Sequence, residues 1–256
     1  MPDWFYRTVS RPLLFRLPAR AARDFALGVM GILARLPGGP AVIDLLGHMR
    51  PDPRLRRSFL GLSLPSAVGL GPALDGSAIA LPALARFGFG FLEVGPVTPE
   101  PHAPSAPVER RADEEALWYP DPPPSLGLEE LRGKLARSSL ALPLIVRVGY
   151  VPGAGPEQAA ADCRRLIDGL SPHAAAFSLT VPAPVLQGGW DDDAWREYLR
   201  SAVVAAAPRP LLLCVPADLD GAAADRLVGA ARAAGVGAVI VDGSVQAKPA
   251  GRLIGL

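Results

Sequence analysis

The sequence predicts an α/β fold: an incomplete barrel of the TIM type, with about six of the eight strand–helix units, preceded by an N-terminal amphipathic helical extension. Six short apolar segments, typical of buried parallel strands, alternate with segments of helical spacing. These apolar segments are centred near Val68, Phe91, Val146, Phe177, Leu213 and Ile240. No strand-to-helix turn carries the glycine pattern of a dinucleotide site or a P-loop, which disfavours the doubly wound folds.

Two amphipathic segments open the chain, at residues 3–17 and 19–36. Both carry arginines among aromatic and aliphatic side chains, and Pro12 is expected to bend the first. Basic amphipathic helices of this kind lie on anionic membrane surfaces, so residues 3–36 predict a peripheral membrane contact. A helix pair that packs against its own domain has the same pattern, and the sequence leaves this alternative open.

The other elements follow in order. We place the helical extension at residues 1–50 and the partial barrel at residues 51–256, with a hairpin at 56–68 and a charged, proline-rich surface loop at 99–125. The expected strands are residues 68–70, 89–94, 142–148, 174–181, 211–215 and 237–241. The expected helices are residues 41–49, 77–86, 128–138, 155–170, 190–206 and 220–234, followed by a tail at 243–256. We expect the acidic run 191–193 and Asp220 at helix starts, where carboxylates interact favourably with the positive end of the helix dipole. This interpretation is preferred to a metal-binding cluster at residues 191–193.

The composition limits the classes of function. The chain has 256 residues, half of them hydrophobic, and a net charge of +1, which suits one large domain and gives no field that would recruit nucleic acid. Two cysteines and three scattered histidines predict no disulfide framework and no metal site, so a cytoplasmic protein is expected. Cys214 ends a strand without a base nearby, and we expect a buried structural thiol rather than a nucleophile.

The first strand–helix–strand unit carries the most specific motifs. They are Gly69-Leu-Gly-Pro-Ala-Leu-Asp75, Glu93-Val-Gly95 and Val97-Thr-Pro-Glu-Pro101. This unit resembles, without a gap, that of the class 2, quinone-dependent dihydroorotate dehydrogenases, and a weaker resemblance spans nearly the whole chain. The resemblance implies an oxidoreductase of pyrimidine biosynthesis. Such an enzyme oxidises dihydroorotate with FMN and a serine base, then passes electrons to a membrane quinone.

Several positions depart from that family's pattern. The serine base falls on Val181, and a valine cannot accept a proton. Thr180 is a weak substitute, expected on the opposite face of the strand. The lysine that serves the flavin falls on Gly76, the fifth-strand lysine falls on Cys214, and a turn threonine falls on Pro96. The last two units, which hold the FMN phosphate in the family, have no counterpart in these 256 residues.

Other positions match the family. Gly71, Asp75, Thr98 and Gly149 are positional matches to its cofactor-binding segments, and Arg111 falls on the arginine beside its quinone. For Arg111, an exposed arginine in a charged loop is the alternative.

The sequence therefore favours a degenerate homologue, a pseudoenzyme without the standard activity that acts as a binding or interaction protein. In this interpretation no cofactor is expected, a homodimer or a partner protein covers the open barrel edges, and the chain attaches to the inner face of the cytoplasmic membrane. The alternative is a divergent FMN-dependent dehydrogenase that is active only with a partner chain. An unrelated small α/β binding protein or a gene fragment is the third hypothesis.

Overall fold

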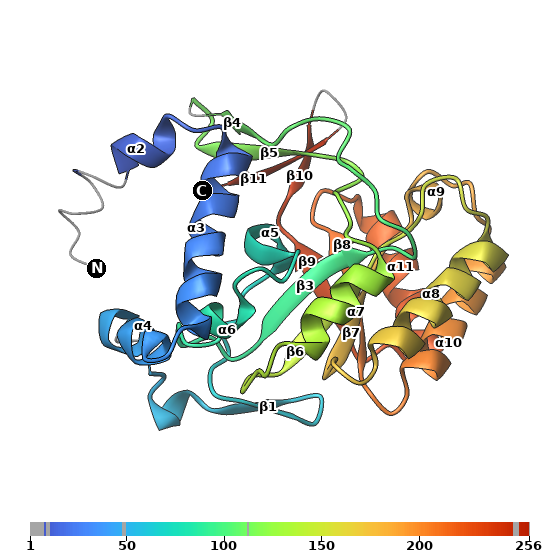
Figure 1. The fold of residues 1–256 in the computed structure, drawn as a ribbon. Helices are drawn as coiled ribbons and strands as arrows, with labels where there is room; N and C mark the ends of the chain where they lie inside the picture. The colour runs from blue at the N-terminus through green and yellow to red at the C-terminus, as the bar shows by residue number, and fades with distance from the viewer. Residues whose placement is uncertain (1–7, 9–10, 48–49, 112, 248–250, 256) are drawn as a thin grey trace.

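A parallel sheet forms the centre of the computed structural model, which describes residues 8, 11–47, 50–111, 113–247 and 251–255 (Figure 1). Its strands are β3 (Leu92–Val97), β6 (Leu144–Val148), β7 (Ala176–Thr180), β8 (Leu211–Pro216) and β9 (Ala238–Asp242), paired in that order and all parallel. Leu70 extends the sheet beyond β3 through a parallel bridge to Leu92. The predicted strand positions are confirmed, although the first is a bridge rather than a strand. In the described residues the sheet does not close into a barrel.

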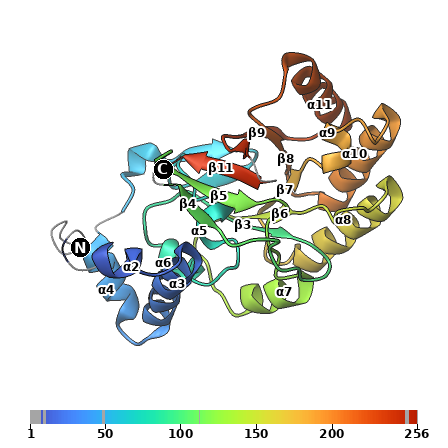
Figure 2. The ribbon, with the colours of Figure 1, turned by 90° about the horizontal axis from the view of Figure 1, so that it is seen from above.

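Helices cover the outer face of this sheet, as Figure 2 shows for α7, α8, α10 and α11. The helices of the barrel region are α5 (Pro72–Asp75), α6 (Leu81–Leu84), α7 (Leu128–Ala136), α8 (Pro156–Leu170), α9 (Ala183–Leu186), α10 (Asp192–Ala206) and α11 (Gly221–Ala234). Alternate strand residues such as Val146, Phe177 and Leu213 point outward and form the main core with these helices. The capping predictions hold: the carboxylates of Asp191 and Asp220 accept hydrogen bonds from the first turns of α10 and α11, each of 2.7 Å.

The other strand residues line the concave inner face, which we call the lumen. A 3-10 turn, η2 (Pro53–Leu55), leads into the predicted hairpin of β1 (Arg57–Phe59) and β2 (Leu62–Leu64). Leu60 and Leu62 of this hairpin pack against Ala176 and Ala238, the first residues of β7 and β9. The hairpin therefore covers the amino end of the lumen.

The N-terminal extension consists of α2 (Arg11–Phe15), α3 (Ala19–Arg35) and α4 (Gly39–Gly47). Pro12 lies in the first turn of α2, and most of the rest of the predicted helix at 3–17 falls outside the described residues. One face of α3, with Ala22, Leu27 and Gly31, is buried against the barrel region. Within the part of the chain that the structure describes, no helix alone has the length and apolarity to cross a membrane. Only α3 combined with Gly39–Leu45 of α4 does, and that pair is bent by 117°.

The expected surface loop at 99–125 and the expected tail at 243–256 are not loops. They contain β4 (Glu109–Arg111), β5 (Ala116–Pro120), β10 (Val245–Ala247) and β11 (Gly251–Gly255), an antiparallel sheet of order β10-β11-β5-β4 (Figure 1). Trp118 of β5 is only 2% exposed and packs against Gly251, where a Cβ atom would lie 2.3 Å from the indole ring. The prediction was wrong because β5 pairs not only with the nearby β4 but also with β11, which lies more than a hundred residues away in sequence, beyond the reach of local patterns.

Candidate functional site

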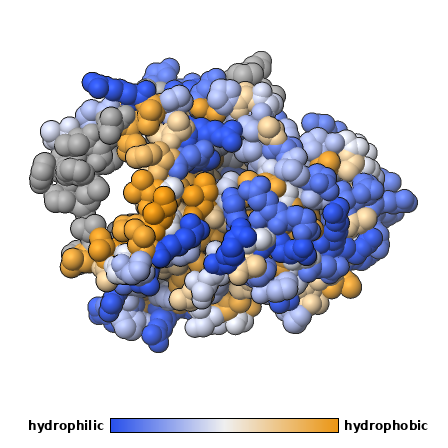
Figure 3. Space-filling model, in the orientation of Figure 1, coloured by the Kyte–Doolittle hydropathy of each residue, from blue (hydrophilic) through white to orange (hydrophobic). Residues whose placement is uncertain are grey.

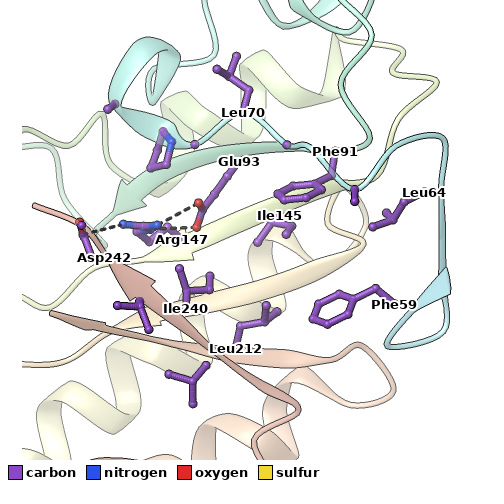
Figure 4. Close-up of a pocket in the computed structure, with 18 of the residues that line it drawn as sticks. Phe59, Leu64, Leu70, Phe91, Glu93, Ile145, Arg147, Leu212, Ile240 and Asp242 are labelled. Atoms are coloured by element: carbon purple, nitrogen blue, oxygen red, sulfur yellow. Dashed lines mark hydrogen bonds and ion pairs between the residues drawn. The ribbon is translucent and has the colours of Figure 1, made fainter. Parts of the chain in front are cut away.

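The lumen contains a cavity of about 1120 Å³, shown in Figure 4. Its walls come from the inner faces of β3, β6, β8 and β9, from the hairpin of β1 and β2, and from residues 69–74. The sequence places apolar and charged side chains at alternate levels of these strands. Phe91, Ile145 and Leu212 lie at the amino-terminal level, and Glu93, Arg147 and Asp242 lie nearer the carboxyl ends.

A charged cluster therefore crosses the lumen. The guanidinium of Arg147 donates two hydrogen bonds of 2.9 Å to the carboxylate of Glu93, and its Nη1 lies 3.8 Å from Oδ2 of Asp242. Ser178 Oγ donates a third hydrogen bond, of 2.6 Å, to Glu93 Oε1. Glu93 and Ser178 are buried, whereas the side chain of Asp242 is 33% exposed. The two-pronged contact with Glu93 is the strong geometry for an arginine–carboxylate pair.

The electrostatics of the cluster favour its ionised form. Burial is the largest influence on Arg147 and acts to lower its pKa, but the charges of Glu93 and Asp242, the hydrogen bonds to Glu93 and the interaction with Cys214 together outweigh it, and the pKa is raised. For Asp242, burial acts to raise the pKa, yet hydrogen bonds from Ser244 and the charges of Arg147 and Arg252 leave it lowered. Burial raises the pKa of Cys214 to about 11, so this residue is a neutral thiol near Asp242 and not a thiolate nucleophile.

Comparisons with known proteins identify the family. The chain is 33% identical over 254 residues to the quinone-dependent dihydroorotate dehydrogenase of Chloroflexus aurantiacus, covering 92% of this chain and 70% of that protein. The chain belongs to the quinone-dependent dihydroorotate dehydrogenase family. It is also 32% identical to the Deinococcus deserti enzyme, over 95% of this chain and 71% of that relative. The solved structure of ligand-free dihydroorotate dehydrogenase from Eimeria tenella has a TM-score of 0.70 at 21% identity, over 85% of this chain and 74% of that chain. No protein-family model matches the chain.

The four positions matched to the family's cofactor segments have different surroundings. Gly71 lines the cavity at the start of α5. Asp75 is 3% exposed and accepts hydrogen bonds from the backbone N–H groups of Ile79 and Ala80, at 2.8 and 2.7 Å. Thr98 Oγ1 donates to the carbonyl of Glu100, at 2.7 Å. Gly149, Asp75 and Thr98 do not line the cavity in the described structure, so the structure brings only Gly71 to the lumen.

The family's base position lies away from the lumen. Val181 is 4% exposed and belongs to the core between the sheet and the helices. Thr180 lies two residues after Ser178 on β7, and the alternation of a strand places it on the same, lumen-facing side as Ser178. The same alternation assigns the hydroxyl of Thr180 to the lumen side, whereas Val181 belongs to the core on the helix side.

Arg111, the match to the quinone arginine, ends β4 and forms an ion pair of 3.3 Å with Glu114. The side chain of its neighbour Arg110 stacks on the ring of Phe15 at 4.7 Å and donates a hydrogen bond to the carbonyl of Leu17. The structure therefore joins the N-terminal helices to the antiparallel sheet through Arg110, a contact that the sequence interpretation missed.

The charged cluster was also missed as a unit, although its signal is present in the sequence. Glu93, Arg147 and Asp242 are each a single charged residue inside an otherwise apolar strand. A charge at such a place is rarely buried without a partner. Glu93 and Arg147 lie in the adjacent strands β3 and β6, whereas Asp242 ends β9 at the far edge of the sheet. The curvature of the sheet around the lumen brings this third charge within 3.8 Å of Arg147, and the sequence does not show that curvature.

Proposed function

We propose that this family member binds at a membrane surface and does not itself carry out the family's dehydrogenation. The observation that carries the proposal is Val181, which stands at the position of the proton acceptor and is packed into the helix-covered core. A general base must be able to take a proton and must lie within hydrogen-bonding reach of the substrate. A buried valine meets neither requirement.

The described residues also do not fit the phosphate of FMN, the cofactor that the sequence resemblance implies. Phosphate sites commonly use the free N–H groups at a helix start. Here α7, α8 and α10 carry carboxylates in their first turns, and the side chain of Asp220 occupies the start of α11. In the lumen, the guanidinium of Arg147 is already held by Glu93. An incoming dianion would therefore meet negative charge or a cation that is already paired.

The N-terminal helices supply the surface for membrane contact. Figure 3 shows apolar side chains gathered along α3 and α4 on the face that it displays. On these helices the exposed large apolar residues are Phe25, Val29, Ile32, Leu36, Val42 and Leu45. Arg20 and Arg35 are exposed on the same helix α3. An apolar face flanked by arginines suits the interface of an anionic bilayer. This supports peripheral binding through α3 and α4.

The membrane part of the proposal is tested by sedimentation with vesicles of phosphatidylglycerol and phosphatidylcholine. We expect the chain to pellet with them and to be released by salt. The double variant Phe25→Asp, Ile32→Asp should stay in the supernatant. The matched control is Val204→Asp on α10, where the side chain is 76% exposed and distant in sequence from the proposed surface. Equal binding of the double variant and the control would contradict the proposal.

The enzymatic part is tested by the visible spectrum and by an activity assay. The purified chain should be colourless after gel filtration, and it should not reduce a short-chain quinone in the presence of dihydroorotate and added FMN. Stoichiometric bound flavin together with turnover would overturn the claim that the chain lacks the dehydrogenation. The claim of membrane binding would still be decided by the sedimentation experiment.

A second candidate function is a divergent dehydrogenase, alone or with a partner chain. The position of Thr180 favours it, because that hydroxyl lies on the lumen side of β7. If this function is correct, Thr180→Ala should abolish turnover, whereas Thr180→Ser should retain it. In the described residues β9 is an edge strand of the parallel sheet. This second candidate function includes a partner, either a second copy of the chain or another subunit, that covers that edge.

A further inference from the structure

The cavity in the lumen has two chemically distinct ends. Its amino-terminal end is mainly apolar and includes Phe59, Phe91, Ile145, Leu212 and Ile240. Arg57 and Ser58 of β1 also line the cavity, and the guanidinium of Arg57 donates to the backbone carbonyls of Arg54 and Arg56. Phe59 remains 45% exposed although it points to this apolar region (Figure 4). The volume of about 1120 Å³ slightly exceeds the roughly 300–1,000 Å³ of small-molecule sites, which are mostly apolar with a few converging polar groups. The cavity therefore has the size and lining of a site for an apolar ligand.

The other end carries a net negative charge. Glu93 and Asp242 contribute two carboxylates, and Arg147 contributes one guanidinium. The guanidinium is committed to Glu93 at 2.9 Å, whereas it lies 3.8 Å from Asp242. Arg252, whose charge also acts to lower the pKa of Asp242, donates to Ser244 and lies 3.6 Å from Asp218. Oδ1 of Asp242 already accepts a hydrogen bond of 2.9 Å from the backbone N–H of Ser244, whereas its Oδ2 has the longer contacts, with Arg147 and with Cys214 Sγ at 3.9 Å. Oδ2 is thus the carboxylate oxygen with room for a further hydrogen-bond donor.

The two ends lie along the same strands. Asp242 and Ile240 are alternate residues of β9, and Arg147 and Ile145 are alternate residues of β6. Alternate residues of one strand are about 7 Å apart, so a straight ligand that lies along the strands meets the charged level and the apolar level in turn. A compact polar ligand would leave the apolar level in contact with water.

We infer that the lumen binds a single-chain amphiphile, with its hydrocarbon chain between Phe91, Leu212 and Ile240 and an amine head group at Asp242. The negative charge of the cluster favours a cationic head over a carboxylate or a sulfate. Burial of the chain supplies the affinity, at about 25 cal/mol for each Å² of apolar surface removed from water. This site is separate from the membrane-facing surface of α3 and α4.

Isothermal titration calorimetry with three probes of one chain length tests this inference. The full chain is titrated with dodecylamine, dodecanol and laurate below their micelle concentrations. We expect dodecylamine to bind at least tenfold more tightly than laurate, with dodecanol between them, and the binding heat capacity to be negative. Equal affinity for all three probes, or no binding of any, would overturn the inference.

Two variants and a control locate the site. Ile240→Glu places a carboxylate at the apolar level of the cavity, on the edge strand β9. Because the hydrocarbon chain would then contact a charge, binding of dodecanol should weaken at least tenfold. Asp242→Asn should keep dodecanol binding and remove most of the preference for dodecylamine. Val204→Glu, on the helix α10, should bind all three probes as the unmodified chain does, and thermal unfolding checks that each variant is folded.

Three further outcomes decide against the inference. Unchanged binding by Ile240→Glu would place the probes elsewhere, for example on the apolar surface of α3 and α4. A dimer in sedimentation that binds no probe and that Ile240→Glu dissociates would show that a second copy of the chain fills the lumen. Dodecylamine binding that Asp242→Asn does not weaken would overturn the assignment of the head group.

Discussion

Arg147 holds Glu93 in the lumen through two hydrogen bonds of 2.9 Å that connect the neighbouring strands β6 and β3. Because Ser178 of β7 also donates to Glu93, one carboxylate joins three adjacent strands. The pair lies in the same cavity as the proposed amphiphile site. Its geometry explains why a charged residue is tolerated inside each of two apolar strands: each charge has its partner on the adjacent strand.

The first prediction concerns this pair. Arg147→Met should destabilise the fold by about 3–5 kcal/mol, because it leaves a buried carboxylate without its counter-charge. The double variant Glu93→Gln, Arg147→Met should recover much of that loss, since it removes both charges. Urea unfolding measures all three free energies. As the matched control, Arg132→Met breaks the exposed pair with Glu129 and should cost less than about 1 kcal/mol. Similar losses for Arg147→Met and Arg132→Met would show that the buried pair contributes nothing special.

The second prediction is a pH dependence. The pKa of Asp242 is lowered in the folded chain, so its ionised form stabilises the fold above the unfolded pKa, and this contribution is lost as pH falls through the folded pKa. The free energy of unfolding should therefore exceed that of Asp242→Asn by a constant amount above about pH 5, and the difference should shrink below about pH 4. Urea unfolding between pH 3 and pH 7 measures it. A difference that grows on acidification would contradict the lowered pKa.

Much of the fold could be predicted from local patterns in the sequence. The elements that could not be predicted depend on pairing between residues that are distant in sequence. The parallel strands and their helices were predictable because short apolar runs, helix caps such as Asp220 and the stop at Gly235 are local signals. The pairing of Tyr119 with Arg252 was not, because nothing near either residue specifies so distant a partner. The charged cluster was missed for a related reason: the strand register pairs Glu93 with Ile145, and Arg147 reaches Glu93 diagonally from two residues further along β6.

The third prediction concerns the two cysteines. Burial raises the pKa of Cys214 to about 11 and that of Cys163 to about 12, so both are protonated thiols at pH 8. We expect neither to react with a disulfide reagent such as dithionitrobenzoate within minutes in the native chain, and both to react rapidly in urea. Absorbance of the released thiolate measures the two rates. Rapid native reaction that Cys214→Ser removes would instead indicate an activated thiol at the end of β8.

The last prediction tests how α3 is attached. Gly31 lies against the backbone of Ile79, where a Cβ atom would be 2.6 Å from the carbonyl oxygen. Gly31→Ala should therefore force α3 away from the barrel region and cost about 1–3 kcal/mol in the free energy of unfolding. Gly28→Ala is the matched control, because it lies in the same helix with no atom within 4 Å of the new Cβ. That change should stabilise the helix by about 0.5–1 kcal/mol. Urea unfolding measures both, and vesicle sedimentation shows whether a displaced α3 still carries the membrane contact. If Gly31→Ala proved as stabilising as Gly28→Ala, the helix would not be packed against Ile79, and its whole surface would be free for the bilayer.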